Sequence, residues 1–348
     1  MVEKSILDSD MDIYEKLRQK MSIWIVHVEK TPELMEILKL LFTPEEAEFL
    51  TSDVFTAPFQ DYRTADEIAQ CTGKTREEVE KIIDSLEEKR LIFKYIDEQA
   101  DEVLYSLLPL EYGSIAYISL VQKPEKRDKL LSLFQKISTG EITMGSGVTE
   151  YPWGRIIPVE ESVIVVNQIL PFAKVEEIMM NARSIAVVYC FCRSQNPCGH
   201  PLETCTGFNE GADFMVSGGF GRYINLEEAL NLLKETEEAG LVHTAVYSRR
   251  GIIYMCNCCT CACPILRRLR DSENPRELSS SGFIPEINRE KCVLCGKCIE
   301  ICPLGARFLY SDNENPERVD VNARQCVGCG QCASHCSEGA TVLVAFEG

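Results

Sequence analysis

The sequence predicts a mixed α+β protein built from three successive parts, and three observations lead to this prediction. Residues 1–125 combine helix-capping signals with two short strand-like runs. Residues 140–270 alternate strand-like and helical patterns around nine cysteines, and residues 284–348 repeat one cysteine motif. A length of 348 residues is consistent with two or three domains.

Helix start signals recur in the N-terminal part. Residues 12–29 mix charged and apolar positions and predict an opening helix. Thr31-Pro32 and Thr43-Pro44 each place an N-cap threonine before a proline in the first turn. From Thr64 onward the pattern predicts a short helix, a turn at 71–74, a longer helix capped by Thr75, and strands at 91–95 and 103–107. This order resembles a winged-helix domain, and lone Cys71 in its turn is expected to be a small buried residue.

The charge of this part argues against nucleic acid. Residues 31–110 carry 19 acidic against 8 basic side chains, and six of the acidic ones lie on the helix that would enter the groove. Because DNA binding depends on neutralising phosphates with Lys and Arg, we expect a protein-docking winged helix and no nucleic-acid partner.

The middle part is predicted to be an α/β domain. Strand-like runs occupy 155–159, 163–166 and 185–189, and a helix is expected from Pro171 through Met180. Asn225 and Glu228 form a capping-box signal for a further helix that ends at Gly240. Its nine cysteines lie in two groups about fifty residues apart: Cys190, Cys192, Cys198 and Cys205, then Cys256, Cys258, Cys259, Cys261 and Cys263.

These nine thiols predict a metal centre to which both groups contribute. They suffice for one or two further [4Fe-4S] clusters, and the spacing does not partition them. Structural zinc is the alternative, and a disulfide network is disfavoured in a reducing compartment. If the second group is extended, Cys259, Cys261 and Cys263 share one face and Cys256 and Cys258 the other. Three histidines near the cysteine motifs, His200, His243 and His335, are expected to lie outside the ligand set.

Several segments of the middle part resemble a group of iron–sulfur proteins from anaerobes with an N-terminal winged helix. The segments are Cys190-Phe191-Cys192-Arg193, then 240–243 (Gly-Leu-Val-His), then 256–259 (Cys-Asn-Cys-Cys), ahead of a ferredoxin-type tail. The resemblance spans most of the chain and implies a fold more than a function. Residues 271–282, rich in Ser, Pro and charge, are expected to be a linker.

The C-terminal part contains two matching cysteine motifs. Cys292, Cys295, Cys298 and Cys302-Pro303 recur 34 residues later as Cys326, Cys329, Cys332 and Cys336-Ser337. Three thiolates two residues apart wrap one corner of a cubane, and the fourth typically ligates the other cluster. This resembles the bacterial two-cluster [4Fe-4S] ferredoxins. The resemblance implies cluster one on Cys292, Cys295, Cys298 and Cys336, and cluster two on Cys302, Cys326, Cys329 and Cys332.

The alternative for these cysteines is a pair of zinc sites. The third cysteine at a spacing of two and the crossed fourth cysteine suit a cubane better and exceed what zinc needs, so iron–sulfur clusters are the better prediction. Ser337 stands where the ferredoxins usually have proline, and we expect it to change loop rigidity without loss of a cluster.

Composition excludes several classes of protein. The N-terminus lacks an apolar signal segment, and no run is long enough to span a membrane, so we expect a cytoplasmic protein whose cysteines bind metal. The net charge of −18 favours redox partners with basic patches. Exposed low-potential clusters would suit an anaerobe.

One-electron transfer is the chemistry that these motifs support. No nucleophile–base constellation and no nucleotide fingerprint is found in the sequence. We therefore predict a component of an oxidoreductase complex that relays electrons from a low-potential donor to a redox enzyme. Two alternatives are a catalytic iron–sulfur site on the middle cysteines and a redox-sensing DNA-binding regulator.

Overall fold

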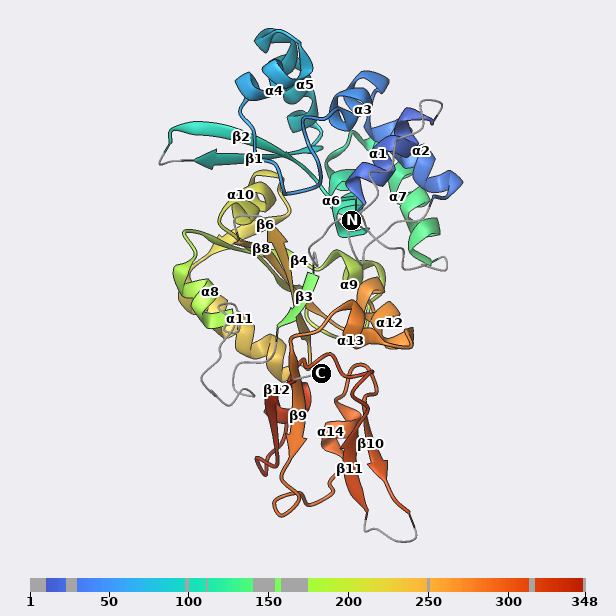
Figure 1. The fold of residues 1–348 in the computed structure, drawn as a ribbon, viewed down its shortest axis with the longest axis vertical. Coiled ribbons are helices and arrows are strands. Elements are labelled where there is room, and N and C mark those ends of the chain that lie inside the picture. Colours follow the sequence, from blue (N-terminus) through green and yellow to red (C-terminus); the bar gives the residue numbers. More distant parts are fainter. Residues whose placement is uncertain are drawn as a thin grey trace. The chain divides into compact units, whose positions relative to one another are not determined.

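The fold was analysed in a computed structural model (Figure 1). It describes residues 11–22, 30–97, 100–110, 112–139, 154–157, 175–248, 251–312 and 317–346. The chain divides into two compact units, Met1–Trp153 and Gly154–Gly348. The expected strand at 163–166 and the start of the helix at Pro171 lie outside the described residues.

Helices α1 to α3 open the N-terminal unit. They are α1 (Ile13–Met21), α2 (Pro32–Leu41) and α3 (Pro44–Thr51). Thr31 and Thr43 cap α2 and α3 through their side-chain oxygens, and Glu46 completes a capping box at Thr43. Both start signals are therefore where the sequence placed them, and each satisfies backbone N–H groups that a helix leaves unpaired.

A helix–turn–helix and a hairpin follow. They are α4 (Ala65–Thr72), α5 (Arg76–Glu88), β1 (Ile92–Asp97) and β2 (Glu102–Leu107), and β1 pairs antiparallel with β2. One face of α5 is buried through Val79, Ile82, Ile83 and Leu86, whereas its acidic face is exposed. Cys71 is exposed in the last turn of α4, so the expected burial was wrong.

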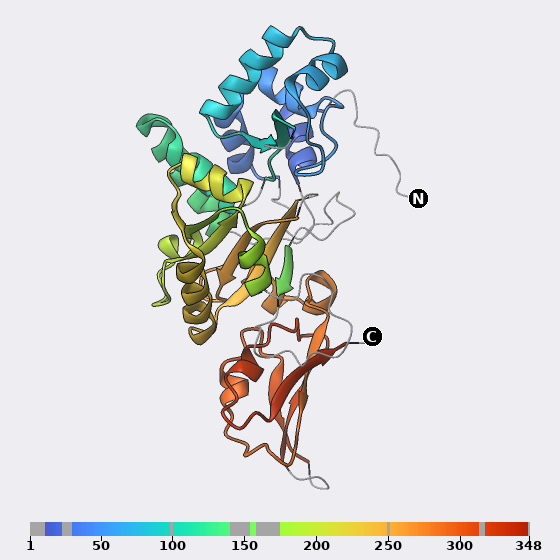
Figure 2. The same ribbon diagram turned by 90° about the vertical axis from the view of Figure 1, so that its left-hand side faces the viewer.

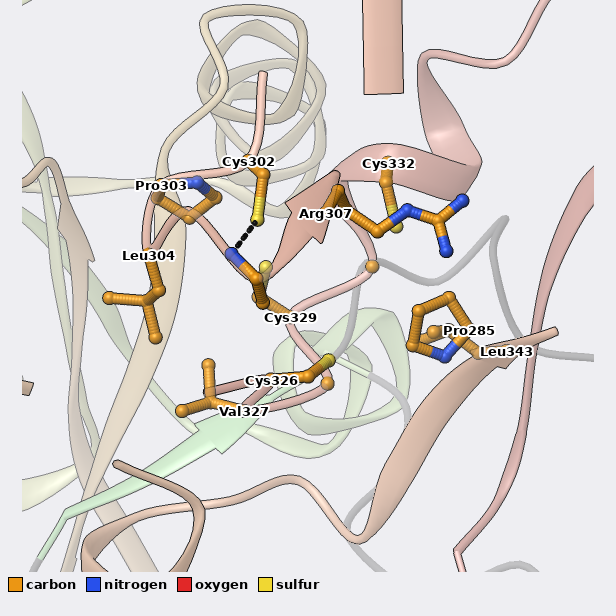
Figure 3. Close-up of a pocket in the computed structure, with 13 residues that line it drawn as sticks. Pro285, Cys302, Pro303, Leu304, Arg307, Cys326, Val327, Cys329, Cys332 and Leu343 are labelled. Carbon is orange, nitrogen blue, oxygen red and sulfur yellow. Dashed lines mark hydrogen bonds between the residues drawn. The ribbon is translucent and has the colours of Figure 1, made fainter. Parts of the chain in front are cut away.

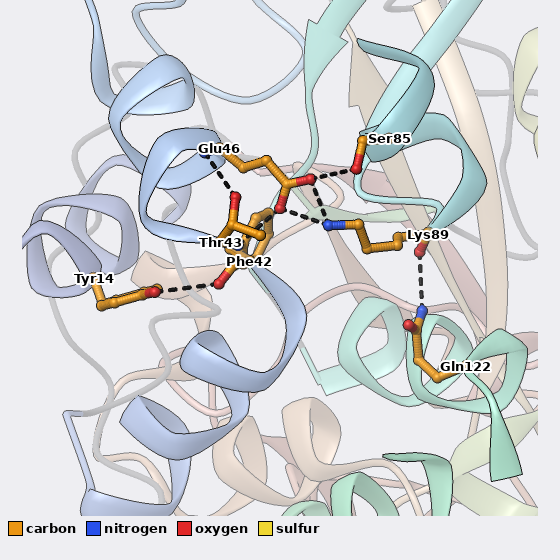
Figure 4. A network of polar contacts seen from close by, with 7 residues as sticks. All are labelled: Tyr14, Phe42, Thr43, Glu46, Ser85, Lys89 and Gln122. Carbon is orange, nitrogen blue, oxygen red and sulfur yellow. Dashed lines mark hydrogen bonds and ion pairs between the residues drawn. The ribbon is translucent and has the colours of Figure 1, made fainter. Parts of the chain in front are cut away.

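A partly buried polar network connects the helices of this unit (Figure 4). The Glu46 carboxylate accepts hydrogen bonds from Lys89 Nζ and, at 2.8 Å, from Ser85 Oγ. The Lys89 carbonyl oxygen accepts one from Nε2 of Gln122, which directly follows α6 (Tyr112–Val121). Helix α6 packs against α7 (Pro124–Thr139). Although burial works against the charge, hydrogen bonds from Lys89, Thr43 and Ser85 lower the pKa of Glu46, so it remains ionised.

A six-stranded sheet forms the centre of the second unit (Figures 1 and 2). Its order is β3 (Gly154–Ile157), β7 (Val242–Ser248), β8 (Gly251–Cys258), β5 (Glu203–Phe208), β4 (Ile185–Tyr189) and β6 (Gly221–Ile224). Every pairing is antiparallel. The expectation of an α/β domain was therefore wrong for this part, because an α/β domain is built on a mostly parallel sheet. Helices α9 (Phe191–Gln195), α10 (Glu210–Ser217) and α11 (Leu226–Glu238) still connect the strands, and among the described elements of the sheet only β7 and β8 follow each other without a helix between them.

Helices α8 (Val175–Asn181) and α11 (Leu226–Glu238) cover one face of this sheet. Their apolar residues, including Met179 and Leu233, pack with Val187, Phe208 and Met255 of the strands. Asn225 and Glu228 form the predicted capping box of α11. Helix α10 packs closely against β8. A Cβ atom on Gly211 would lie only 2.2 Å from the Ile253 carbonyl oxygen of this strand.

The C-terminal part is a structural repeat. Its elements are β9 (Phe283–Ile287), α14 (Lys297–Glu300), β10 (Arg307–Tyr310), β11 (Arg318–Val321), α15 (Gln331–Ser334) and β12 (Thr341–Ala345). Strand β10 pairs with β11, and β9 pairs with β12, as Figure 2 shows in orange and red. Each half supplies one cysteine loop, one short helix and strands of two small sheets, as the 34-residue repeat predicts.

The segment expected to be a linker is packed. After α12 (Pro264–Asp271), residues 275–278 form the short helix α13 (Pro275–Leu278). Arg276 Nε donates to the Ala323 carbonyl at 2.7 Å, and Ser281 N donates to the Val327 carbonyl at 3.0 Å. Among the described residues, no helix is long and apolar enough to cross a membrane.

Candidate metal centres

Two cavities lie in the C-terminal repeat, and four cysteines line each. One, of about 350 Å³ with part of it open to solvent, is lined by Cys302, Cys326, Cys329 and Cys332 (Figure 3). The other, of about 390 Å³, is lined by Cys292, Cys295, Cys298 and Cys336. The fourth cysteine of each motif therefore lies at the cavity of the other half.

The backbone around these cavities repeats as well. Gly296 and Gly330 adopt the left-handed conformation before α14 and α15, with φ of 77° and 87°. Cys302 Sγ accepts a hydrogen bond from Ala306 N at 3.2 Å, and Cys336 Sγ accepts one from Ala340 N at 3.3 Å. Amide donors directed at sulfur stabilise a thiolate ligand and help to set the potential of its cluster.

Arg307 borders both cavities, and Figure 3 shows it at the first. It is 3 % exposed, and its Nη2 donates to Thr341 Oγ1 at 3.3 Å. Its Nε and Nη1 have no hydrogen-bond partner among the described residues. A buried guanidinium with free donors fits a site that receives negative charge, because an unpaired buried cation is strongly disfavoured.

Burial raises the pKa of three thiols of the first cavity. The affected residues are Cys326, Cys329 and Cys332, the last to about 12. Such thiols ionise when a cation binds them. The orphaned Arg307 donors and the amide-to-sulfur bonds of this part fit two cubane clusters.

In the middle part, six thiols lie near one another in a ring, and each influences the pKa of two neighbours. Cys190 is coupled to Cys192 and Cys205, and Cys263 is coupled to Cys192 and Cys258. Cys256 is coupled to Cys205 and Cys258, which closes the ring. The sheet creates this ring, because β5, which carries Cys205, lies between β4, which leads to Cys190, and β8, which carries Cys256 and Cys258.

Thiolate character alternates around the ring. Hydrogen bonds from two neighbouring thiols lower the pKa of Cys190 to about 2 and of Cys256 to about 5, and they lower that of Cys263 as well. The pKa values of the thiols that donate these bonds, Cys192, Cys205 and Cys258, are raised. The six thiols of the ring therefore titrate as one coupled group.

The other three cysteines form a separate group with a histidine. The ligand atoms of Cys198, His200, Cys259 and Cys261 all lie within 4.8 Å of one another, so this group can hold a metal ion. Four ligands about 2.3 Å from a tetrahedral zinc lie about 3.8 Å apart, close to the 3.7 Å between the sulfurs of Cys198 and Cys259. Burial and the neighbouring Arg193 charge lower the pKa of His200, which favours the neutral imidazole that binds metals.

Arg193 is close to both groups of thiols. It follows Cys192 in α9 (Phe191–Gln195), is 1 % exposed, and donates from Nη2 to Thr204 Oγ1. In the part of the chain that the structure describes, its Nε and Nη1 have no hydrogen-bond partner. Burial opposes its charge, yet the thiols of Cys190, Cys205, Cys259 and Cys258 raise the pKa of Arg193.

A chain of polar contacts holds the cysteine-bearing strands in register. Asn257 is fully buried between Cys256 and Cys258, and its Nδ2 donates to the Thr204 carbonyl at 2.5 Å. Its Oδ1 is 2.5 Å from His243 Nδ1, and His243 Nε2 is 3.2 Å from Glu237 Oε1. His243 and Asn257, from two of the segments that carry the resemblance, are therefore partners across β7 and β8.

The expectation that Cys259, Cys261 and Cys263 share one face was wrong. Cys263 joins Cys256 and Cys258 in the ring, whereas Cys259 and Cys261 join Cys198. Alternation holds only in extended chain, and β8 ends at Cys258. The following turn, in which Cys263 N donates to the Cys259 carbonyl at 3.0 Å, returns Cys263 to the ring.

A buried contact joins the C-terminal repeat to the middle part. Gln331, between Cys329 and Cys332 in the chain, is fully buried and donates from Nε2 to the Leu241 carbonyl at 2.6 Å. Leu241 packs in turn against Cys259 and Cys198. One short path therefore links a cavity of the repeat to the four-residue group.

Comparison with known proteins supports the C-terminal part. Residues 291–340 match the family described as 4Fe-4S dicluster domain. This part of the chain is thus a ferredoxin-like dicluster domain with two 4Fe-4S clusters, which suggests an electron-transfer role and redox partners in general. No curated protein matches the chain. No solved structure matches it either.

Sequence reasoning missed three residues of these centres. His200 was expected outside the ligand set, and Arg193 and Gln331 were given no role at the metal centres. A His two residues after a cysteine was a usable signal for the first. The burial of the other two depends on contacts between distant segments.

Proposed function

We propose that this protein relays single electrons through the two clusters of its C-terminal repeat. The observation that carries the proposal is the pair of cavities, each lined by four cysteines, with Arg307 bordering both. All-cysteine cubanes exchange one electron each, and the two sites are adjacent because Arg307 lines both cavities. Cluster one would use Cys292, Cys295, Cys298 and Cys336, and cluster two would use Cys302, Cys326, Cys329 and Cys332.

The exposure of the two loops supports a direction for the relay. Val293 is 63 % exposed in the loop of cluster one, and Cys295 is exposed beside it. The equivalent Val327 in the loop of cluster two is 2 % exposed, and Gln331 connects that loop to Leu241. In our proposal a soluble partner docks at the loop of cluster one, and cluster two exchanges electrons with the middle part.

The partners of this relay would be redox proteins with basic surfaces. The chain has 54 acidic and 36 basic side chains, and each all-thiolate cubane adds about two negative charges. We place the protein in the cytoplasm of an anaerobe, as a component of an oxidoreductase complex that connects a low-potential donor with a redox enzyme.

We assign protein docking to the N-terminal unit. Helices α4 and α5 and the β1–β2 hairpin have the order of a winged helix, and the exposed face of α5 carries Glu77, Glu80, Asp84 and Glu88. That face would be repelled by phosphates. A gel shift at low salt tests this assignment: no retardation of DNA is expected, whereas salt-sensitive retardation would favour a DNA-binding regulator.

Anaerobic reduction tests the relay. The chain, reduced with dithionite and mixed with an oxidised ferredoxin, should bleach and recover in the visible iron–sulfur bands, with about two electrons per chain from the repeat. The Cys295→Ala/Cys329→Ala variant serves as the control and should lose this reversible change. A chain that contains both clusters but is neither reduced nor reoxidised would contradict the proposal.

A further inference from the structure

The six-thiol ring differs from the other thiol groups in its ligand number. It consists of Cys190, Cys192, Cys205, Cys256, Cys258 and Cys263, from three separate segments of the chain. One tetrahedral ion takes four ligands. The ring therefore offers more thiolates than one ion can bind.

The ring is also more open than the neighbouring group. Within the described part of the chain, the group whose ligand atoms all lie within 4.8 Å of one another is Cys198, His200, Cys259 and Cys261. The ring thiols are spread over the end of β4, β5 and the end of β8, and among the described residues no three of them lie that close together. The compact group suits a single ion, whereas an open ring of six suits several metal ions bridged by inorganic sulfide.

Arg193 and Arg307 share three features. Each is buried, each donates from Nη2 to a threonine, and in each the Nε and Nη1 atoms find no hydrogen-bond partner within the described ranges. Arg307 borders the two cavities of the dicluster domain. Arg193 follows Cys192 of the ring in α9 and lies close to Cys190 and Cys205, so a negatively charged cluster there would satisfy its free donors.

We propose that the six-thiol ring holds one polynuclear iron–sulfur cluster of at least four irons, with Arg193 as its buried counter-charge. Iron is favoured because soft thiolates select iron–sulfur clusters or zinc, and this chain already receives two iron–sulfur clusters in its C-terminal part. The inference rests on the proposed function, since it adds a third redox centre at the inner end of the relay.

Metal analysis of the full chain, purified without oxygen, tests the ring. The unaltered protein should contain about twelve or more irons with matching acid-labile sulfide, of which about eight belong to the repeat. The Cys205→Ala/Cys256→Ala variant should return to about eight. The control Cys71→Ala, at an exposed cysteine outside every thiol group, should keep the full count.

Three results would overturn the inference: about eight irons in the unaltered chain, zinc in the ring, or a double variant that keeps the additional iron. The eight irons of the repeat report whether that variant has folded. A count well below eight in the unaltered chain would instead refute the proposed function, so the two failures can be told apart.

A second measurement remains informative if the double variant does not fold. Arg193→Met should make the reduction potential of the additional cluster more negative, and Arg193→Lys should restore part of the shift. Arg307→Met should move only the signals of the two clusters in the repeat. Equal potentials in the Arg193 variants and the unaltered protein would contradict the role of Arg193.

Discussion

The two cysteine loops of the C-terminal repeat share one motif but have different surroundings. Residues 292–298 present Val293 and Cys295 to solvent, whereas residues 326–332 bury Val327 and Gln331. Their cysteines, glycines and amide-to-sulfur bonds match at a shift of 34 residues. The difference teaches that one loop sequence can be exposed in one copy and buried in the other, and our proposal assigns partner docking to the exposed copy.

Removal of the fourth cysteine of each motif should have the largest effect. Cys302→Ala should convert or abolish the cluster bound by Cys326, Cys329 and Cys332, with the loss of at least one of its roughly four irons. Cys336→Ala should do the same to the other cluster. EPR of each reduced variant identifies the surviving cluster, and Ser337→Pro, which changes no ligand, should keep both.

If Cys302→Ala instead removed the cluster bound by Cys292, Cys295 and Cys298, the crossed ligand assignment would be wrong. The cysteines that line each cavity would then not be the ligands of the cluster in it.

Paired substitutions at the apolar loop positions should have the next largest effect. Val327→Ala should reduce the free energy of unfolding by roughly 1–3 kcal/mol, because it leaves a cavity beside cluster two. Val293→Ala, at the equivalent exposed position, should leave stability unchanged and slow the reaction with a soluble redox partner. Anaerobic denaturant titration measures the stability of both variants, and stopped-flow kinetics measures their reaction with the partner. Equal losses of stability in the two variants would contradict the difference in burial between the two loops.

The smallest effect is expected at the contact with the middle part. Gln331→Leu should cost about 1 kcal/mol, because the buried Leu241 carbonyl loses its donor while the unpartnered Gln331 Oε1 is removed at the same time. Lys297→Leu, 34 residues earlier, is the matched control and should not change stability. A Gln331→Leu variant as stable as the unaltered chain would show that the contact contributes little.

The sequence predicted those features well that depend on residues close together in the chain. Thr31, Thr43 and Asn225 cap the helices that their sequence context indicated. The repeat predicted which cysteines share each cavity, although their ligation remains a prediction. Each of these inferences depends on a few adjacent residues.

The grouping of the cysteines in the middle part was less predictable, because the topology of the sheet decides which thiols become neighbours. Cys205 and Cys256 become neighbours through the pairing of β5 with β8, and a turn after β8 separates Cys259 from Cys258. Neither the pairing nor the turn is marked by a motif. For the same reason the sequence suggested an α/β arrangement where the strands are antiparallel.

Spin counting tests the central claim most directly. Fully reduced unaltered protein and the Cys302→Ala/Cys336→Ala variant are compared by EPR, with Cys71→Ala as the control. The account predicts that the unaltered chain and the control exceed the double variant by about two interacting spins per chain, one for each cluster of the repeat. No difference between them would mean that these eight cysteines do not carry the electrons.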